Sequence, residues 1–411
     1  MPVEALQCKE CHEQYPLEAL YVCDRCFGPL EVKYDFSGLD PDGARRKIQA
    51  GPRSIWRYSD FLPFEKKPPA PLTTGTTPLL KADRLAERLG LREVYVKNDA
   101  ANPTHSFKDR VVTVALAKAR ELGYKVVACP STGNLANAVA AHAAANGLES
   151  YVFIPADLEE QKVLATGVYG TTLVKVRGSY DDVNRLCMEL AAEREEWAFV
   201  NVNVRPYYAE GSKTLGYEIA EQLSFRLPDR VVAPIASGSL FTKIARGFEE
   251  WQEVGLLADG KQPVFNGAQG EGCAPVATAF AEGWEICKPV RPSGIAKSLA
   301  IGNPADGPYA LELARKSGGT VESVSDDEIR EGIRLLAETT GVFTETAGGT
   351  TTAVLRKLAQ RGDIDPDERV VLVITGEGLK TLDAVRDTFE AHEIDPSTDA
   401  FEALEGASVG A

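Results

Sequence analysis

From residue 75 onward, short apolar runs alternate with longer amphipathic stretches. The apolar runs are rich in valine and isoleucine and lie at 94–96, 125–129, 151–154, 172–176, 199–202, 231–235, 264–268 and 370–374. Stretches with helical spacing lie between most of them, at 111–122, 134–146, 158–167, 181–195, 211–223, 239–252 and 275–282. This alternation is typical of βαβ units and predicts an α/β fold built on mostly parallel sheet. In such folds ligands bind at the carboxyl ends of the strands.

The N-terminus shows a different pattern, because four of the eight cysteines lie within its first 26 residues. Cys8, Cys11, Cys23 and Cys26 form two Cys-x-x-Cys pairs separated by eleven residues. Two such pairs can place four thiolates at the corners of a tetrahedron around zinc. Two disulfides are the alternative, which a cytoplasmic compartment disfavours. We therefore expect a structural Zn²⁺ here, since four thiolates leave no open position for a substrate.

The sequence suggests three regions. Residues 1–36 form the expected zinc-ribbon-like knuckle, and residues 37–74, which contain several prolines, are expected to form an extended arm with one short helix at 41–49. Residues 75–411 form the main body, with a smaller subdomain at about 100–207. The residues from Phe401 to the end are mostly small and polar, and we expect them to fray.

Composition limits the classes of function. The chain has 411 residues, of which 44% are hydrophobic, and a formal net charge of −15. That charge argues against a nucleic-acid partner, which would require a basic face. No apolar run is long enough for a membrane span, and the first residues lack the layout of a secretory signal. We therefore expect a cytoplasmic protein that does not bind membranes.

One lysine has an unusual setting. Lys108 lies in the stretch Asn-Pro-Thr-His-Ser-Phe-Lys-Asp-Arg (102–110), between an expected strand and an expected helix. A lysine in the first turn of a helix is usually solvated, so the stretch alone does not identify a function. A rival, Lys297, lacks this strand-then-helix setting.

Three polar loops further along the chain strengthen the case. They follow expected strands and read Ser-Thr-Gly-Asn (131–134), Ala-Ser-Gly-Ser-Leu (236–240) and Thr-Gly-Glu-Gly-Leu-Lys (375–380). Small and hydroxyl residues at a helix N-terminus suit an anion, although any one of these loops could be an ordinary capping turn. Together with Lys108 they suit a phosphate, a phenolic oxygen and a pyridine nitrogen. The combination predicts an enzyme whose lysine amine forms a Schiff base with pyridoxal phosphate.

The segment 97–110 resembles the cofactor-lysine motif of the threonine synthase family, within the fold type II (tryptophan synthase β-like) pyridoxal phosphate enzymes. Later segments fit the same family, so the resemblance covers roughly residues 75–385. It implies two open, mostly parallel α/β domains with the cofactor in the cleft between them. It also implies a homodimer, and it fits the N-terminal knuckle, which some members carry.

The resemblance also implies roles for individual residues. Lys108 would be the catalytic lysine that holds the cofactor, and Asn134 would contact the phenolic oxygen. Ser237, Gly238 and Ser239 would bind the cofactor phosphate, and Thr375 would meet the pyridine nitrogen.

For the substrate, Ser131 and Thr132 would bind the α-carboxylate, whereas Arg205 and Lys97 would approach the substrate phosphate. The chain departs from the family at His105, where most members carry glycine. That imidazole could contact the substrate, relay a proton or only pack the turn.

The implied reaction converts O-phospho-L-homoserine and water into L-threonine and phosphate by γ-elimination followed by β-addition of water. Two alternatives use the same cofactor: a β-replacement synthase acting on phosphoserine, such as a cysteine or cysteate synthase, and a serine/threonine dehydratase, which needs no second phosphate pocket. An alternative from another class is a zinc-ribbon interaction protein.

Overall fold

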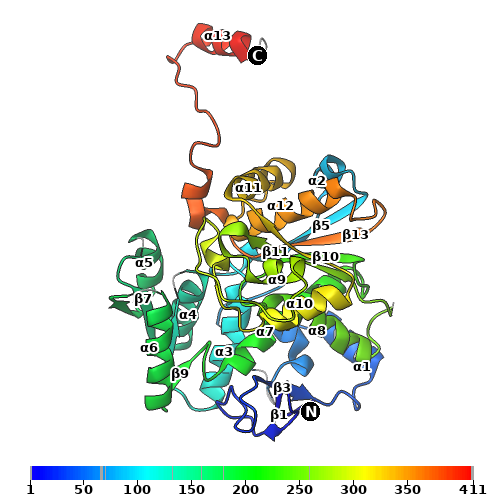
Figure 1. Cartoon of the computed structure of the whole chain (residues 1–411), viewed down its shortest axis with the longest axis vertical. Coiled ribbons are helices and arrows are strands. Elements are labelled where there is room, and N and C mark those ends of the chain that lie inside the picture. Colours follow the sequence, from blue (N-terminus) through cyan, green and yellow to red (C-terminus); the bar gives the residue numbers. More distant parts are fainter. Residues whose placement is uncertain are drawn as a thin grey trace.

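The chain folds around two mostly parallel sheets, with a third, three-stranded sheet at the N-terminus (Figure 1). The structure is a computed structural model and describes residues 2–64, 68–69, 71–131, 133–158, 160–178, 180–258 and 260–408. The expected α/β architecture with two mostly parallel sheets is confirmed. Among the described residues, no helix is both long and apolar enough to span a bilayer.

The larger sheet has six strands in the order β12-β11-β10-β13-β5-β4. All neighbours are parallel except β4, which runs antiparallel to β5 at the sheet edge. The strands are β4 (Leu79–Lys81), β5 (Glu93–Asn98), β10 (Arg230–Pro234), β11 (Val264–Gly270), β12 (Val321–Val324) and β13 (Arg369–Ile374). Its helices are α2 (Asp83–Leu89), α8 (Ser239–Glu253), α9 (Pro275–Ala281), α10 (Gly307–Lys316), α11 (Asp326–Thr340) and α12 (Thr346–Arg361). The central strands read as continuous apolar runs because helices cover both faces of the sheet.

The smaller sheet has four parallel strands in the order β8-β7-β6-β9. The strands are β6 (Val126–Pro130), β7 (Glu149–Pro155), β8 (Thr172–Val176) and β9 (Trp197–Phe199). Three helices lie beside it in Figure 1: α4 (Asn134–Asn146), α5 (Glu160–Gly167) and α6 (Tyr180–Glu193). Two further helices, α3 (Lys108–Glu121) and α7 (Arg205–Gln222), pack against each other near the middle of the molecule. The smaller sheet lies within the expected 100–207 segment, whose status as a subdomain stays a prediction.

The N-terminal sheet is antiparallel and has the order β2-β1-β3. Its strands are β1 (Val3–Cys8), β2 (Gln14–Tyr15) and β3 (Leu30–Tyr34), and α1 (Pro41–Ala50) and the 3₁₀ segment η1 (Ile55–Phe61) follow them. Buried polar contacts join β3 to the main body. The Tyr34 hydroxyl donates to Glu210 of α7 at 2.7 Å, and the Lys243 ammonium of α8 lies 3.3 Å from Glu31 and 3.1 Å from Glu210.

Several expectations about individual elements are wrong. The helix expected at 111–122 begins earlier, at Lys108, and the helix expected at 211–223 begins at Arg205. The sequence patterns also missed β4, β12, α2 and α10–α12. At the C-terminus the expected fraying is wrong as far as Ser408, because α13 (Thr398–Ser408) forms a helix that stands apart from the body (Figure 1).

A buried ionic network joins β5, α3 and α7. The Arg110 guanidinium of α3 binds both carboxylate oxygens of Asp99, at 2.6 and 2.8 Å, and one oxygen of Glu218, at 2.7 Å. Lys97 binds the other oxygen of Glu218 at 2.7 Å. Burial alone would raise the pKa of Glu218, but Arg110 and Lys97 outweigh burial and hold that pKa well below its ordinary value.

We expect Glu218→Gln to lower the free energy of unfolding by about 3–5 kcal/mol at pH 7, because it leaves buried positive charge uncompensated. Since the pKa of Glu218 is depressed, the carboxylate stabilises the wild type above its ordinary pKa, and the contribution is lost as the pH falls below that value. Urea denaturation between pH 7 and pH 3 measures both effects. The exposed residue Glu338 provides the control, and Glu338→Gln should change stability by less than about 0.5 kcal/mol. Equal losses in the two variants would contradict the assigned role of the network.

Candidate active site

Lys108 is the first residue of α3, and its ammonium donates to the Tyr208 hydroxyl of α7 at 2.8 Å. The turn before it is fixed on both sides. The Phe107 amide donates to the Thr375 carbonyl at 2.8 Å, and Ser106 forms a bridge with Gly376. After the turn, the buried Asp109 carboxylate accepts hydrogen bonds from the amide and hydroxyl of Thr104, both at 2.9 Å. The lysine is therefore half-buried on a rigid turn at the carboxyl end of the larger sheet.

Thr375 follows the last residue of β13 and is nearly buried. Its backbone carbonyl accepts from Phe107, whereas its hydroxyl makes no hydrogen bond to any residue that the structure describes. The strand therefore presents this hydroxyl beside the lysine turn, where a ring nitrogen is expected to bind.

Asn134 is the first residue of α4, a helix that packs against the smaller sheet. Its side-chain amide donates to both carboxylate oxygens of Glu345 at 3.0 Å. Glu345 is the N-cap residue of α12 and is buried. Burial raises the pKa of Glu345, and the Asn134 hydrogen bond and the charges of Lys380 and Lys108 only partly offset this effect. The sequence analysis gave Glu345 no role.

The loop 237–239 forms the N-terminus of α8. Gly238 has φ 97°, and a Cβ atom there would lie 2.5 Å from the Asp306 carbonyl oxygen, so only glycine fits this turn. The N-cap residue provides no side chain to the first-turn amides. Arg205, the first residue of α7, lies close by, because its guanidinium binds the Asp306 carboxylate at 2.8 Å and the Asp306 amide donates to the Ser237 carbonyl at 2.8 Å.

The expectation that Lys97 binds the substrate phosphate is wrong. Its side chain is completely buried, and its ammonium donates to the Thr77 carbonyl, Glu218 and Gln222, all within 2.8 Å. With all three N–H groups engaged inside the protein, Lys97 has no donor left for a substrate. It is a structural member of the buried ionic network.

The remaining predicted substrate residues differ in position. Ser131 is buried, and its hydroxyl accepts from the amides of Gly133 and Ala136, so it caps α4. Thr132 lies outside the described residues. The His105 side chain is exposed and makes no hydrogen bond within the described part of the chain, so its role stays a prediction. Its backbone has φ 60°, a left-handed conformation that favours glycine and accounts for the family's preference.

Tyr208 is the site residue that sequence reasoning missed. A signal for it existed, since Tyr208 lies three residues after Arg205 and the two would share one face of a helix. The expected helix began only at residue 211, so this spacing went unused. The structure thus brings together Lys108, Asn134, Arg205, Thr375 and the loop 237–239, and adds Tyr208 and Glu345.

These residues fit pyridoxal phosphate. The N-terminus of α8, with its glycine turn at Gly238, suits the cofactor phosphate, and Lys108 offers an amine at the start of α3. The hydroxyl of Thr375 has no protein partner among the described residues and so can serve a ligand. Asn134 contacts Glu345, whose backbone amide donates to the carbonyl of Gly376, the residue after Thr375, so the Asn134 amide and Thr375 belong to one connected set of contacts.

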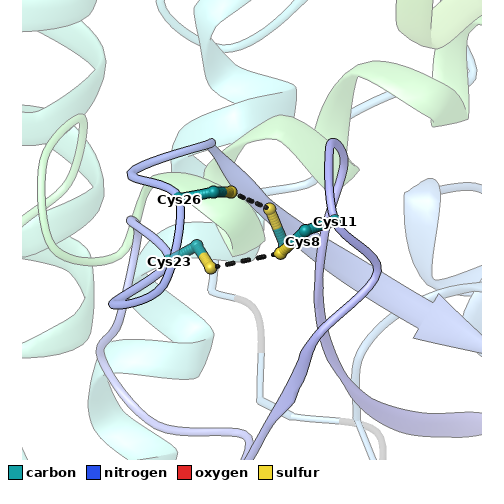
Figure 2. Close-up of side chains that lie close together, drawn as sticks. All are labelled: Cys8, Cys11, Cys23 and Cys26. Atoms are coloured by element: carbon teal, nitrogen blue, oxygen red, sulfur yellow. Dashed lines mark hydrogen bonds between the residues drawn. The ribbon is translucent and has the colours of Figure 1, made fainter.

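The four N-terminal cysteines converge as expected (Figure 2). Their sulfur atoms all lie within 4.8 Å of one another, and the Cys8–Cys26 and Cys11–Cys23 pairs are 3.4 and 3.5 Å apart. None of the four forms a disulfide. Around a zinc ion with bonds of about 2.3 Å, tetrahedral sulfur atoms are about 3.8 Å apart. The cluster therefore fits a structural zinc site.

Hydrogen bonds favour the thiolate form at one of these cysteines. Burial opposes ionisation of Cys23, but hydrogen bonds from the Tyr15 hydroxyl and from the backbone amides of Cys26 and Arg25 outweigh burial and lower the pKa of Cys23 to about 6. A thiolate is the form that binds zinc. The sulfur geometry therefore carries the assignment of a zinc site, and the lowered pKa of Cys23 agrees with it at one of the four thiols.

We expect the purified protein to contain about one zinc ion per chain. Cys8→Ser and Cys26→Ser should lose the metal and lower the melting temperature, since the ribbon holds β3 against α7 and α8. Elemental analysis and thermal melts measure both quantities. Cys287→Ser, which removes a thiol far along the chain from the cluster, should keep the zinc. A wild-type protein without zinc, whose melting temperature is unchanged by added zinc, would contradict the assignment.

Comparisons with known proteins support this geometry. The profile of the family described as pyridoxal-phosphate dependent enzyme matches residues 71–376. A threonine synthase of Methanosarcina acetivorans is 39% identical over 388 residues, which cover 94% of each chain. A threonine synthase of Methanocaldococcus jannaschii is 37% identical and covers 92% of this chain and 93% of its own.

Solved structures show the same fold at lower identity. An L-serine ammonia-lyase from Rhizomucor miehei has a TM-score of 0.64 at 21% identity, covering 76% of this chain and 96% of its own. A threonine deaminase isoform from Solanum lycopersicum has a TM-score of 0.62 at 18% identity, covering 100% and 93%. At these identities the likeness concerns the fold alone. The chain belongs to the family of pyridoxal-phosphate-dependent enzymes, in the branch that contains the threonine synthases.

Proposed function

We propose that the protein is a threonine synthase, which converts O-phospho-L-homoserine and water into L-threonine and phosphate. The observation that carries the proposal is the 39% identity to a threonine synthase over 94% of the chain. The contacts of the candidate site support it: Lys108 contacts Tyr208, and Asn134 at the start of α4 contacts Glu345 at the start of α12. The cytoplasmic location and the homodimer that the family resemblance implies belong to this proposal.

Bound pyridoxal phosphate supplies the electron sink that stabilises negative charge next to the amino group of the substrate. Lys108 is the residue that moves protons at that position, and an amine can take a proton only when it is neutral. The Tyr208 hydroxyl, 2.8 Å from the Lys108 Nζ atom, holds the amine in place on the rigid turn before α3. Because α3 and α7 pack together, the two groups keep this separation.

Thr375 favours replacement chemistry over transamination. A hydroxyl at the pyridine nitrogen does not hold a proton there as a carboxylate would, so the electron sink is weaker. Elimination and replacement need less charge withdrawal than transamination does. This agrees with the proposed elimination of phosphate followed by addition of water.

Arg205 is the side chain that we assign to the substrate phosphate. Asp306 holds one terminal nitrogen of the guanidinium at 2.8 Å, and the planar group keeps further N–H donors for an anion. Its position at the N-terminus of α7 adds the favourable field of the helix dipole. Lys97, which the sequence suggested as a second cation, does not contribute.

The proposal predicts that the purified protein loaded with pyridoxal phosphate releases phosphate from O-phosphohomoserine and forms threonine. Lys108→Ala should abolish turnover, since it removes the amine that we assign to the bond with the cofactor. Phosphate release and amino-acid analysis measure the reaction, with O-phosphoserine in parallel. Turnover of phosphoserine alone would point to a β-replacement synthase, and a fully active Lys108→Ala would refute the assigned site.

Tyr208→Phe should lower turnover by about tenfold to a hundredfold, because it removes the hydrogen bond that holds the Lys108 amine. The Michaelis constant for O-phosphohomoserine should change little if the hydroxyl acts on the lysine. The neighbouring Tyr207 is a matched control on the same helix, since its hydroxyl donates to the Glu18 carbonyl at 2.9 Å, away from the site. Tyr207→Phe should cost about 1 kcal/mol of stability and leave turnover unchanged. Equal turnover in both variants would remove Tyr208 from the mechanism.

A further inference from the structure

Glu345 is a buried carboxylate at the candidate active site to which the proposed reaction assigns no part. Only 2% of the residue is exposed. It precedes the first residue of α12, on the larger sheet, and its backbone amide donates to the Gly376 carbonyl at 3.1 Å. An ionisable group in such a place normally has a specific partner, because burying an unpaired charge is costly.

The partner of Glu345 is Asn134, which belongs to the smaller sheet. The Asn134 Nδ2 atom lies 3.0 Å from each carboxylate oxygen, so a single N–H placed between them accounts for both distances. Because the nitrogen of the amide contacts both carboxylate oxygens, the amide turns its NH₂ group toward Glu345. The second N–H of the same group then remains for a ligand. The contact thereby selects one of the two orientations of the amide.

The close approach of Glu345 requires glycine at position 376. A Cβ atom on Gly376 would lie 2.3 Å from the Glu345 Oε1 atom, which is shorter than any permitted contact. Gly376 follows Thr375, the residue expected at the pyridine nitrogen, and pairs with Ser106 before Lys108. The carboxylate therefore lies behind the residues that would surround the cofactor ring.

Lys380 provides compensating charge for Glu345. Its ammonium is shielded from solvent and makes no hydrogen bond to any described residue. Burial lowers the pKa of Lys380, and among nearby charges Glu345 has the largest opposing effect. Among the charged groups near Lys380, Glu345 is therefore its main electrostatic partner.

We propose that Glu345 is a positioning residue, which holds the Asn134 amide in the orientation that presents an N–H donor to the phenolic oxygen of the cofactor. Without the carboxylate, the amide can rotate by half a turn and present its carbonyl oxygen to an oxygen that also accepts, which disfavours binding. The inference rests on the proposed cofactor contact of Asn134, but not on the identity of the substrate.

The test is a double-mutant cycle on cofactor affinity, measured by titrating the apoprotein with pyridoxal phosphate. Asn134→Ala and Glu345→Ala should each weaken binding by about tenfold or more. The double variant should bind no more weakly than Asn134→Ala alone, since Glu345 acts through that residue. If the two losses multiply, Glu345 has only a general structural role and the proposal fails. The cycle uses no substrate, so it gives an answer even if O-phosphohomoserine is not turned over.

Two further variants keep the test decisive if Glu345→Ala folds poorly. Glu345→Gln retains an oxygen that can accept from the amide and should restore part of the affinity. Gly376→Ala keeps the carboxylate but displaces it, and should reproduce the loss seen in Glu345→Ala. Glu338→Gln, on the exposed face of α11, is the control for removing a negative charge and should bind the cofactor as the wild type does. The proposal is overturned if Glu345→Ala, Glu345→Gln and Gly376→Ala all bind pyridoxal phosphate with wild-type affinity.

Discussion

The ion pairs of Arg110 hold together the elements on which the candidate active site depends. Arg110 lies two residues after Lys108, and its guanidinium connects α3 to Asp99, after β5, and to Glu218 of α7. Each of these charges is removed from water, so the network is stable only with all of its partners present. Lys108, the strand that precedes it and the helix that carries Tyr208 are therefore placed by one set of buried charges. Lys108 and the polar groups around it can keep hydrogen-bonding capacity free for a ligand, because the buried charges beside them are fully paired.

A second network of mostly buried charges joins α7, α8 and β3. The network consists of ion pairs and one hydrogen bond among side chains of α7, α8 and β3. These side chains are Glu210 and Lys213 of α7, Lys243 and Glu250 of α8, and Glu31 and Tyr34 of β3. The helix that begins with Arg205 and the helix that begins with the cofactor loop are thus joined one turn or more behind their N-termini. Rigid helix ends are what an anion site built from backbone amides requires.

The sequence predicted the fold more completely than the site. Parallel strands such as β10 and β13 are apolar after their first residue, and this composition identifies them without any knowledge of their neighbours. The edge strands β4 and β12 of the larger sheet went unrecognised because they are only three and four residues long. Helices α2 and α10–α12 were also missed, although α11 begins with a Ser-x-x-Glu capping box and ends at Gly341. Lys108, Asn134 and the loop 237–239 could be singled out from the sequence because each follows a strand as part of a recognisable motif. Lys97 was misassigned because a lysine in a strand reads the same whether it faces a ligand or a buried glutamate, and Tyr208 was missed because the start of α7 was placed six residues too late.

The attachment of β3 has a consequence for the modular organisation of the chain. A cysteine knuckle of this kind looks like a portable unit whose boundary follows its last strand. Here that boundary would separate Tyr34 and Glu31 from the charges of α7 and α8 that they help to balance. Exchange of the knuckle between proteins, by recombination or by engineering, must therefore preserve these two residues together with their partners in the body. The cysteine spacing indicates a metal site, whereas the unit that must stay intact also includes Glu31, Tyr34 and their partners in α7 and α8.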